Sequence, residues 1–518
     1  MIVGDTANTS GDWSVEPILT VGEINPAGES INAIHLGYEI PGVPDGLGAF
    51  QVDENTVRVL INHELGNTAG NAYELSNGTE LTGARISYVD IDRNTRRPTK
   101  GGLAVDTIYN RAGDDVDSPD DLDYAGLNRL CSGTFYPPNQ FGPGLGFADP
   151  IYLTSEEQSS ASGPPGGTYW VLDPVNGELW AAPDLGRGSW ENATILDTGR
   201  TDTVALLLGD DHGAASGSSA PEDSDPDNPS PPLYMYVGVK DSSGNFIERN
   251  GLVGGSLFVW QADDSSVNDP SDFNGTGSSE SGHWVDITSY NTGTPGSDYT
   301  DDGYATDATL RRAAVAEGAF QFSRPEDLAT NPRNGTEAVM ASTGRSNILG
   351  DADVWGTVYV IETDFEFIGP GALDTAGTET TLTILYDGDD ADHQREGVRS
   401  PDNVDWADNG SIFVQEDDSV GFATYEASIW QLDPGTPGDA TRILEMDRSA
   451  VPLGQNDNHH GLAGAWESSG VLDVTSLFKT ESGETLLILD VQAHSLNDGL
   501  VGDAGLVEGG QLLFATNS

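Results

Sequence analysis

Pairs of short apolar strands recur along the whole chain, and this repetition limits the folds open to it. In each pair the first strand ends in polar residues and a second strand follows. The pattern occurs six times, with first strands at 56–64, 151–157, 204–211, 337–343, 411–417 and 486–494. This irregular repeat favours an all-β, six-bladed β-propeller whose first strands line a central channel. Two packed β-sheets are the alternative, because alternating hydrophobicity alone does not separate the two folds.

In a propeller, the polar ends of the first strands would meet at one mouth of the channel. The residues concerned are His63, Glu64, Glu156, Glu157, Asp210, Asp211, Glu416, Asp417 and His494. Polar groups that converge from distant parts of a chain are typical of a binding site. The pattern therefore predicts a polar site at this mouth.

Turn-forming residues and polar loops fit the same architecture. The 518 residues include 65 glycines and 28 prolines, as expected for many short strands and turns. We expect a single propeller domain over residues 1–518, with polar insertions around 212–232 and 263–302. Each insertion is a solvated loop, a lid or a calcium-bound excursion, and composition favours the solvated loop.

The charge balance excludes several classes of partner. Asp and Glu number 84 against 22 Lys and Arg, which gives a net charge of -62. Such a chain repels nucleic acid and anionic membranes. High salt, bound calcium or a simple need for solubility would each explain the acidity. Lysine occurs only at Lys100, Lys240 and Lys479, and this scarcity favours a saline, halophilic setting.

The sequence also bears on the location of the protein. It has no run of 18 apolar residues, so we expect no membrane span. The segment Met1–Asp5 lacks the basic and apolar regions of a signal peptide. An extracellular or periplasmic location would then require a leader that has been removed or another export route. The oligomeric state is left open.

Cys131 is the one cysteine of the chain, so it forms no internal disulfide. It is either a small buried hydrophobe or a sulfur with a chemical role. The carboxylate pairs in the same sequence favour the second interpretation, because a soft thiolate beside hard oxygen ligands suits a mixed metal site.

Arg324 and Glu326 are two residues apart in Arg324-Pro-Glu-Asp327. In an extended segment they share one face, where Arg324 could bind an anionic oxygen beside a cation held by Glu326. A surface ion pair is the alternative. Glu191 follows Trp190, which suggests either a ligand or ordinary packing. Asp402 in Ser-Pro-Asp-Asn is equally a calcium ligand or a turn residue.

Other motifs exclude rival functions. The segment 387–392 resembles a calcium loop, but its twelfth position is Val398, so it is not an EF-hand. His459 and His460 lack a matching third zinc ligand. The chain contains neither a P-loop nor a Gly-x-Ser-x-Gly elbow, which argues against an NTPase and an α/β-hydrolase.

Six motifs in a fixed order resemble the PhoX-type alkaline phosphatases, a secreted family with a mixed iron–calcium centre on a six-bladed propeller. They are Leu-Cys131-Ser-Gly-Thr, Leu-Thr-Ser-Glu156-Glu157, Leu-Gly-Arg-Gly-Ser-Trp-Glu191-Asn-Ala, Arg324-Pro-Glu326-Asp, Ser-Pro-Asp402-Asn and Val-Gln-Glu416-Asp417. The resemblance covers roughly residue 45 to the end. Its C-terminal part looks like a marine branch of the family.

The resemblance implies a role for each matching residue. Cys131 would bind iron (Fe3+), and Glu191 would be shared by iron and calcium (Ca2+). Glu156 and Glu326 would bind calcium, and Arg324 would bind phosphate. Asp417 is a looser match to a metal-ligating aspartate. We add Asp402 and Asp210 as metal ligands from their predicted positions.

The implied activity is metal-dependent hydrolysis of small phosphomonoesters. A calcium-stabilised propeller without catalysis is one alternative, and a propeller hydrolase of another type, such as a lactonase or a phytase, is the second. Neither alternative needs the thiol of Cys131, so metal analysis and a Cys131→Ser variant separate them from a phosphatase.

Overall fold

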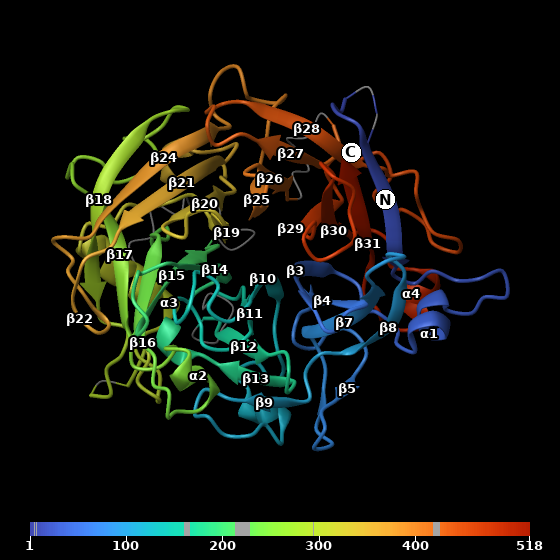
Figure 1. Ribbon diagram of the computed structural model, residues 1–518, viewed down its shortest axis with the longest axis horizontal. Helices are drawn as coiled ribbons and strands as arrows, with labels where there is room; N and C mark the ends of the chain where they lie inside the picture. The colour runs from blue at the N-terminus through green and yellow to red at the C-terminus, as the bar shows by residue number, and fades with distance from the viewer. Residues whose placement is uncertain are drawn as a thin grey trace.

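The computed structural model describes residues 1–4, 6, 8–159, 166–212, 228–293, 295–417 and 425–517. In these residues the chain is mostly β-strand, and its sheets are arranged around a common centre as in a propeller (Figure 1). The expected propeller-like architecture built from β-strands is therefore confirmed, and a few short helices accompany the strands.

Four of the larger sheets contain four or five strands each. The first contains β3 (Pro44–Gln51), β4 (Thr56–His63), β7 (Arg85–Asp92) and β8 (Pro98–Leu103). The second contains β10 (Leu130–Tyr136), β11 (Ile151–Glu156), β12 (Tyr169–Asp173), β13 (Glu178–Ala181) and β9 (Thr107–Tyr109). The third contains β25 (Pro401–Trp406), β26 (Ile412–Glu416), β27 (Ser428–Leu432), β28 (Ala440–Met446) and β1 (Ile2–Val3). The fourth contains β29 (Glu467–Asp473), β30 (Thr485–Ala493), β31 (Gly509–Asn517) and β2 (Trp13–Thr20).

A fifth sheet is larger and has nine strands. One half contains β14 (Trp190–Leu196), β15 (Thr203–Asp210), β16 (Tyr234–Val239) and β17 (Ser256–Ala262). The other half contains β19 (Pro325–Thr330), β20 (Glu337–Ser342), β21 (Thr357–Asp364) and β24 (Glu379–Asp387). Strand β18 (Ser279–Ile287) joins the halves, because it pairs with β17 on one side and β24 on the other.

The remaining elements are short. Two-stranded pairs are formed by β5 (Tyr73–Glu74) with β6 (Glu80–Leu81) and by β22 (Phe367–Gly369) with β23 (Ala372–Leu373). The α-helices are α1 (Ile31–Leu36), α2 (Phe246–Arg249), α3 (Asp307–Ala316) and α4 (Gly499–Asp503). In the described part of the chain, no helix is long and apolar enough to cross a membrane.

The strands nearest the centre are not those that the sequence pattern indicated. Strands β3, β10, β14, β19, β25 and β29 each contact the next, and β29 contacts β3, so they surround the centre (Figure 1). We call them the innermost strands. The prediction that the long apolar strands line the channel was wrong, because each of them pairs with an innermost strand and is second in its sheet.

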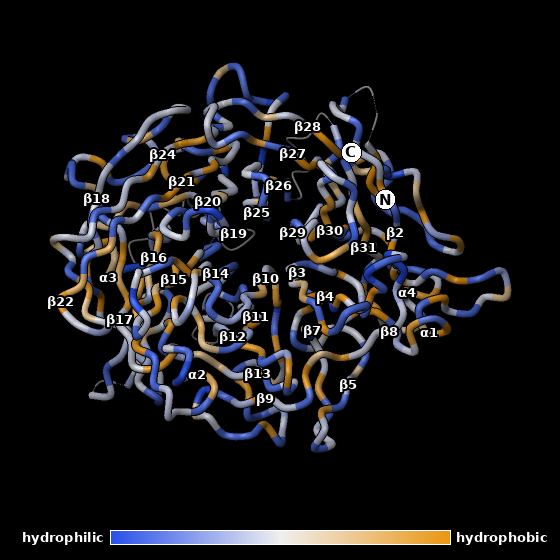
Figure 2. Tube along the Cα trace, viewed as in Figure 1, coloured by the Kyte–Doolittle hydropathy of each residue, from blue (hydrophilic) through white to orange (hydrophobic). Residues whose placement is uncertain are grey.

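The second strands are apolar on both faces because sheets pack on both sides of them. In β15, Val204, Leu206 and Leu208 belong to one hydrophobic core, whereas Ala205 and Leu207 belong to the next. Figure 2 shows apolar residues along many of the strands and hydrophilic residues along many outer loops. Because of this two-sided burial, the second strands are apolar at nearly every position and lack the alternation of a strand with one solvated face.

The two N-terminal strands, β1 and β2, belong to sheets that are otherwise formed by C-terminal strands. Strand β2 pairs with β31, and β1 pairs with β28, so N-terminal segments lie beside C-terminal ones. The ring of innermost strands then closes where β29 meets β3.

The two expected insertions have different outcomes. Most of 212–232 lies outside the described residues. The segment 263–302, expected to be polar loop, contains strand β18, so that expectation needs correction for 279–287. Ser279 and Thr383 share a hydrogen bond across the β18–β24 pairing, which shows how so polar a strand is held.

Candidate metal and phosphate site

All six innermost strands contain the same irregularity near their start. In β10, Leu130 pairs with Glu156 and the next pair is Gly133 with Thr154, so β10 carries one extra residue. The same three-against-two step occurs after Pro44, Trp190, Pro325, Pro401 and Ser469. A β-bulge of this kind turns side chains away from the regular ladder.

The first residue of the bulge carries the chemistry of the site. It is Asp45, Cys131, Glu191, Glu326 and Asp402 in five strands, and all five side chains are buried. In the sixth strand it is Gly470. A structural repeat thus brings one thiol and four carboxylates to the same end of the channel.

The second residue of the bulge ties neighbouring innermost strands together. The Asn192 amide donates to Ser132 Oγ at 2.8 Å and also to the Asp327 carboxylate. Ser132 Oγ donates to Asp327 Oδ1 at 3.1 Å, and Val404 N–H donates to Asp327 Oδ2 at 3.0 Å. These bonds link β10, β14, β19 and β25 directly beneath the acidic residues, which fixes their spacing.

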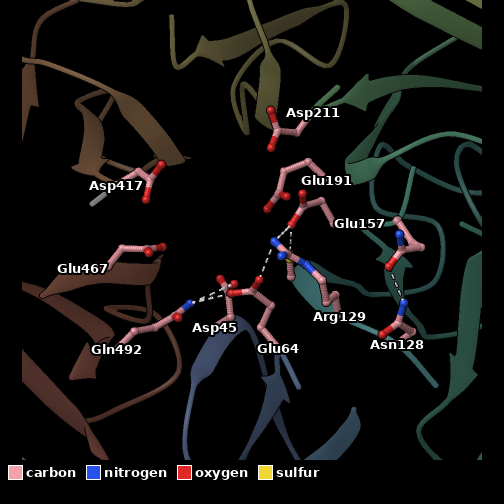
Figure 3. A network of polar contacts seen from close by, with 12 residues as sticks. Asp45, Glu64, Asn128, Arg129, Glu157, Glu191, Asp211, Asp417, Glu467 and Gln492 are labelled. Carbon is pink, nitrogen blue, oxygen red and sulfur yellow. Dashed lines mark hydrogen bonds and ion pairs between the residues drawn. The ribbon is translucent and has the colours of Figure 1, made fainter. Parts of the chain in front are cut away.

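Three overlapping groups of side chains have the spacing of metal ligands. Within each group the ligand atoms lie within 4.8 Å of one another. The groups are Asp45–Glu64–Cys131, Cys131–Glu157–Glu191 and Glu191–Glu326–Asp402. Because Cys131 and Glu191 each belong to two groups, the potential ligands form a continuous arc from β3 to β25. Figure 3 shows part of this arc, with Asp45, Glu64, Glu157 and Glu191 around the open centre.

Further acidic residues follow the second strands. Glu64, Glu157, Asp211 and Asp417 each come directly after the last residue of β4, β11, β15 or β26. Figure 3 shows these four side chains around the same centre as the bulge residues. The second strands therefore contribute side chains to the site from the residue that follows each strand, although the strands themselves do not line the channel.

Two arginines, Arg129 and Arg324, stand immediately before innermost strands β10 and β19. Arg324 donates Nε to Asp211 Oδ1 at 2.6 Å and Nη2 to Asp211 Oδ2 at 2.9 Å. Its Nη2 also lies 3.0 Å from Glu326 Oε1, and its Nη1 lies 3.8 Å from Asp417. Arg324 is thus aligned by a bidentate carboxylate and points into the acidic site.

Arg129 has the corresponding environment one sheet away. Its Nη2 contacts the Glu157 carboxylate and lies 2.7 Å from Glu64 Oε1. Its side chain remains 43% exposed, which makes it the more accessible of the two arginines. Both guanidinium groups therefore reach the site beside potential metal ligands.

Burial and mutual repulsion define the electrostatics of the site. Burial, followed by the charges of Glu64, Glu191 and Glu157, raises the pKa of the Cys131 thiol well above its usual value. Burial and then neighbouring carboxylates likewise raise the pKa values of Glu191, Glu326 and Asp402. Such a set retains protons unless cations replace them, and thiolate with carboxylates is a donor set that fits metal ions.

Four of the expected site residues come together and two do not. Cys131, Glu191, Glu326 and Asp402 share the arc of potential ligands. Arg324 lies beside this arc, and Asp417 lies near Arg324. Glu156 and Asp210 belong to none of these groups, and their carboxylates have other hydrogen-bond partners.

The Glu156 carboxylate accepts main-chain N–H groups of Asn128 at 3.1 Å and Thr168 at 3.2 Å. Asp210 accepts the Ser189 N–H at 2.9 Å and pairs with the buried Arg311 at 2.8 Å. Each of these carboxylates accepts a main-chain N–H group from the segment that immediately precedes an innermost strand. Within the adjacent pair 156–157, the structure places Glu157 beside Cys131.

Sequence reasoning placed Glu64 and Glu157 at the channel mouth without selecting them as metal ligands, and it missed Asp45 and Arg129 altogether. One usable signal was present: Pro44-Asp45 has the same form as Pro325-Glu326 and Pro401-Asp402, which were selected. All three dipeptides begin an innermost strand at its bulge. Arg129 precedes its strand as Arg324 does, but the innermost strands themselves were not recognised.

The opposite end of the channel is chemically different. A cavity of about 960 Å³ is lined there by the far ends of innermost strands, among them Phe50, Tyr136, Thr330, Trp406 and Leu472. Asp405, Asp408 and Asp473 also line this cavity, but the groups of side chains with the spacing of metal ligands lie at the other end of the described innermost strands.

Comparisons with known proteins agree with this picture. Residues 173–430 match the family model described as alkaline phosphatase PhoX. This stretch includes Glu191, Arg324, Glu326, Asp402 and Asp417. No curated protein matched the sequence.

Among solved structures, the chain is similar to Pseudomonas fluorescens PhoX in complex with vanadate, a transition state analogue. The TM-score is 0.61 at 15% identity, covering 99% of this chain and 97% of that chain, which supports the fold. More distant matches are a glycosyl hydrolase from Bacteroides ovatus (TM-score 0.33, 11% identity, 84% and 97% coverage) and the β-propeller domain of the Trilobed protease from Pyrococcus furiosus (0.28, 6%, 87% and 89%).

Proposed function

Because residues 173–430 place the chain in the PhoX alkaline phosphatase family, we propose that it is a metal-dependent phosphomonoesterase. The observation that carries the proposal is the convergence of Cys131, Glu157 and Glu191, with Arg324 beside the same arc. Sulfur and oxygen ligands next to a guanidinium suit a centre that binds both metal ions and a phosphoryl group.

The ligand set divides by chemistry. Cys131 is the soft ligand and would hold iron together with Glu191 and Glu157. Glu326 and Asp402, with Glu191, form an all-oxygen group that suits calcium. Glu157 takes the place that the sequence motif assigned to Glu156. Bound metal ions would offset the negative charge that develops on the phosphoryl oxygens during displacement.

The arginines would bind and orient the phosphoryl group. Asp211 and Glu326 hold Nε and Nη2 of Arg324 at 2.6–3.0 Å, whereas Nη1 has only the longer contact of 3.8 Å with Asp417, so Nη1 is the group that would turn toward a substrate oxygen. Arg129, which precedes β10 on the other side of β14, would bind a second oxygen. Two guanidinium groups favour the dianionic phosphate of a monoester over the single charge of a diester.

Metal analysis by mass spectrometry and hydrolysis of a chromogenic phosphomonoester test the proposal. We expect iron and calcium in the purified protein and hydrolysis that a chelator abolishes. Arg324→Ala should lower kcat/KM at least about tenfold. Arg97→Ala removes the same charge at an exposed site paired with Glu16 and is the matched control.

Two results would overturn the assignment in different ways. Calcium without iron, and no hydrolysis, would indicate a calcium-stabilised binding propeller. Hydrolysis of other esters that survives Cys131→Ser would indicate a lactonase-like or phytase-like enzyme. Unchanged kinetics in Arg324→Ala would remove Arg324 from the substrate site.

We further propose that the sheets form six blades, with the nine-stranded sheet counted as two blades joined by β18. The support is the identical bulge in six innermost strands of the described chain. A single domain over 1–518, export from the cell and a saline habitat remain proposals. The net charge of -62 and the exported character of the family support the last two.

A further inference from the structure

Asp490 is a fully buried carboxylate on β30, and neither of its oxygens has a hydrogen-bond partner among the described residues. Burying an unpartnered carboxylate is costly unless a proton or a cation compensates it. The contrast with its counterparts is sharp. Glu156 and Glu416 occupy the same register position in their sheets, and both accept main-chain N–H groups.

Gly470 explains where the Asp490 carboxylate lies. Gly470 is the sixth bulge residue, at the position of Asp45 and Cys131 in their strands. A Cβ at Gly470 would come within 3.1 Å of Asp490 Oδ2 and 2.6 Å of the Asp45 main-chain oxygen. The carboxylate of Asp490 therefore occupies the space that a bulge side chain would fill.

Two nearby side chains of the described chain also carry a buried oxygen atom without a hydrogen-bond partner. Asp45 is 4% exposed and its Oδ1 has no partner among the described residues; the same holds for Oε1 of the fully buried Gln492, two residues from Asp490 on β30. The Gln492 amide donates to Asp45 Oδ2 at 3.1 Å, so the two side chains are in direct contact. Figure 3 shows Gln492 turned toward Asp45.

We propose that Asp490 and Asp45, with the Gln492 amide oxygen, hold a calcium-like cation between β29 and β3. All the donors are oxygens, which suits a hard divalent ion. The position shares Asp45 with the arc of potential ligands and contains no sulfur. Because β29 and β3 are where the ring of innermost strands closes, this cation would join segments more than 400 residues apart.

The proposal does not depend on catalysis. Its consequence is that calcium stabilises the protein at the closure, whether or not the centre hydrolyses phosphoesters. A raised pKa of Asp490, caused by burial and then by Glu467, shows that a proton is the competing occupant. The experiment must therefore separate a bound cation from a retained proton.

The test uses the full-length protein with Asp490→Asn and the control Asp353→Asn. Asp353 is also a buried aspartate, but Ser342 and Thr357 contact its carboxylate. Calcium and iron per chain are measured by mass spectrometry after dialysis against calcium. We expect Asp490→Asn to contain one calcium fewer with iron unchanged, and Asp353→Asn to match the wild type.

Thermal unfolding with and without added calcium is the second readout. Asp490→Asn should lose most of the calcium-dependent rise in Tm at the concentrations that saturate the wild type. If Asp490→Asn fails to fold, Gln492→Met removes one oxygen ligand and should weaken this calcium at least tenfold. Unchanged calcium content and an unchanged calcium response in the folded variants would overturn the proposal and assign a proton to Asp490.

Discussion

Gly46 is the position where one added methyl group should test the geometry of the site. It is the second bulge residue of β3, next to Asp45, and faces the start of β10. A Cβ there would lie 2.1 Å from Gly133 N, 2.3 Å from Ser132 C and 2.7 Å from Cys131 O. All three neighbours are main-chain atoms, so no rotamer change relieves the contact.

The expected cost follows from these distances. Non-bonded carbon contacts are normally about 3.5 Å or longer, so Gly46→Ala must separate β3 from β10 by roughly 1 Å. Overpacking of this kind costs about 1–3 kcal/mol, and the main-chain neighbours place Gly46→Ala at the upper end. Against a total stability of about 5–15 kcal/mol, that loss is large. The same movement draws Asp45 away from Cys131, so metal content should fall as well.

Urea unfolding followed by circular dichroism measures the change, with Gly66→Ala as the control. No atom lies within 4 Å of the Cβ position at Gly66, and its φ is not positive. Gly66→Ala should be neutral or stabilise by about 0.4–1 kcal/mol, because alanine restricts the unfolded chain. Equal midpoints and equal metal content in the two variants would refute the close approach of β3 and β10.

Three further predictions concern individual carboxylates and the net negative charge. Glu157→Gln should lower the metal content with little change in stability, because Glu157 is a potential ligand. Glu156→Gln should keep its metals and lower the free energy of unfolding by about 1–3 kcal/mol, because the Glu156 oxygens accept two buried N–H groups. Mass spectrometry and urea midpoints measure the two effects, and the reverse pattern would make Glu156 the ligand. Burial and then the charge of Asp473 raise the pKa of Asp405 from 3.8 to about 8. Between these two values the folded protein keeps a proton that the unfolded chain has lost, so the free energy of unfolding should fall as pH rises from about 4 to 8 and level off above. Urea midpoints measured across this pH range should fall less in Asp405→Asn than in the wild type. Raising NaCl from 0.1 to 1 M shortens the Debye length from about 10 to 3 Å and screens the mutual repulsion within this chain of net charge -62, so the urea midpoint should increase. An unchanged midpoint would mean that bound cations already neutralise the repulsion.

The sequence predicted the β class and the second strands because those strands are long apolar runs. Leu206 and Leu207 serve two different cores, which makes the strand apolar throughout. The innermost strands were missed because a bulge near the start of each one interrupts its alternation, and the first bulge residue is polar or a cysteine in five of the six. The segment beginning Leu130-Cys131-Ser132 has no hydrophobic alternation to reveal it.

The choice between adjacent carboxylates was beyond sequence reasoning for a related physical reason. Glu156 and Glu157 are chemically alike, and only the strand register decides which one faces the centre. Glu156 is the last paired residue of β11 and lies opposite Leu130, whereas Glu157 follows the strand and reaches Arg129. Motif order identified the neighbourhood of the site, and the structure identifies the individual side chains.

Arg129 and Arg324 both have a left-handed backbone conformation, and this conformation is a feature of the fold and not of phosphate binding. Arg129 has φ 45° and Arg324 has φ 65°, conformations that cost a non-glycine residue on the order of 1 kcal/mol or more. Val43 and Ser400 stand at the same position before their innermost strands, with φ 49° and 44°. Because a valine and a serine share the strain, it belongs to the bulged strand entrance and not to phosphate binding. What is specific to the site is the placement of arginine at two of these entrances, where the same backbone aims a guanidinium between carboxylates.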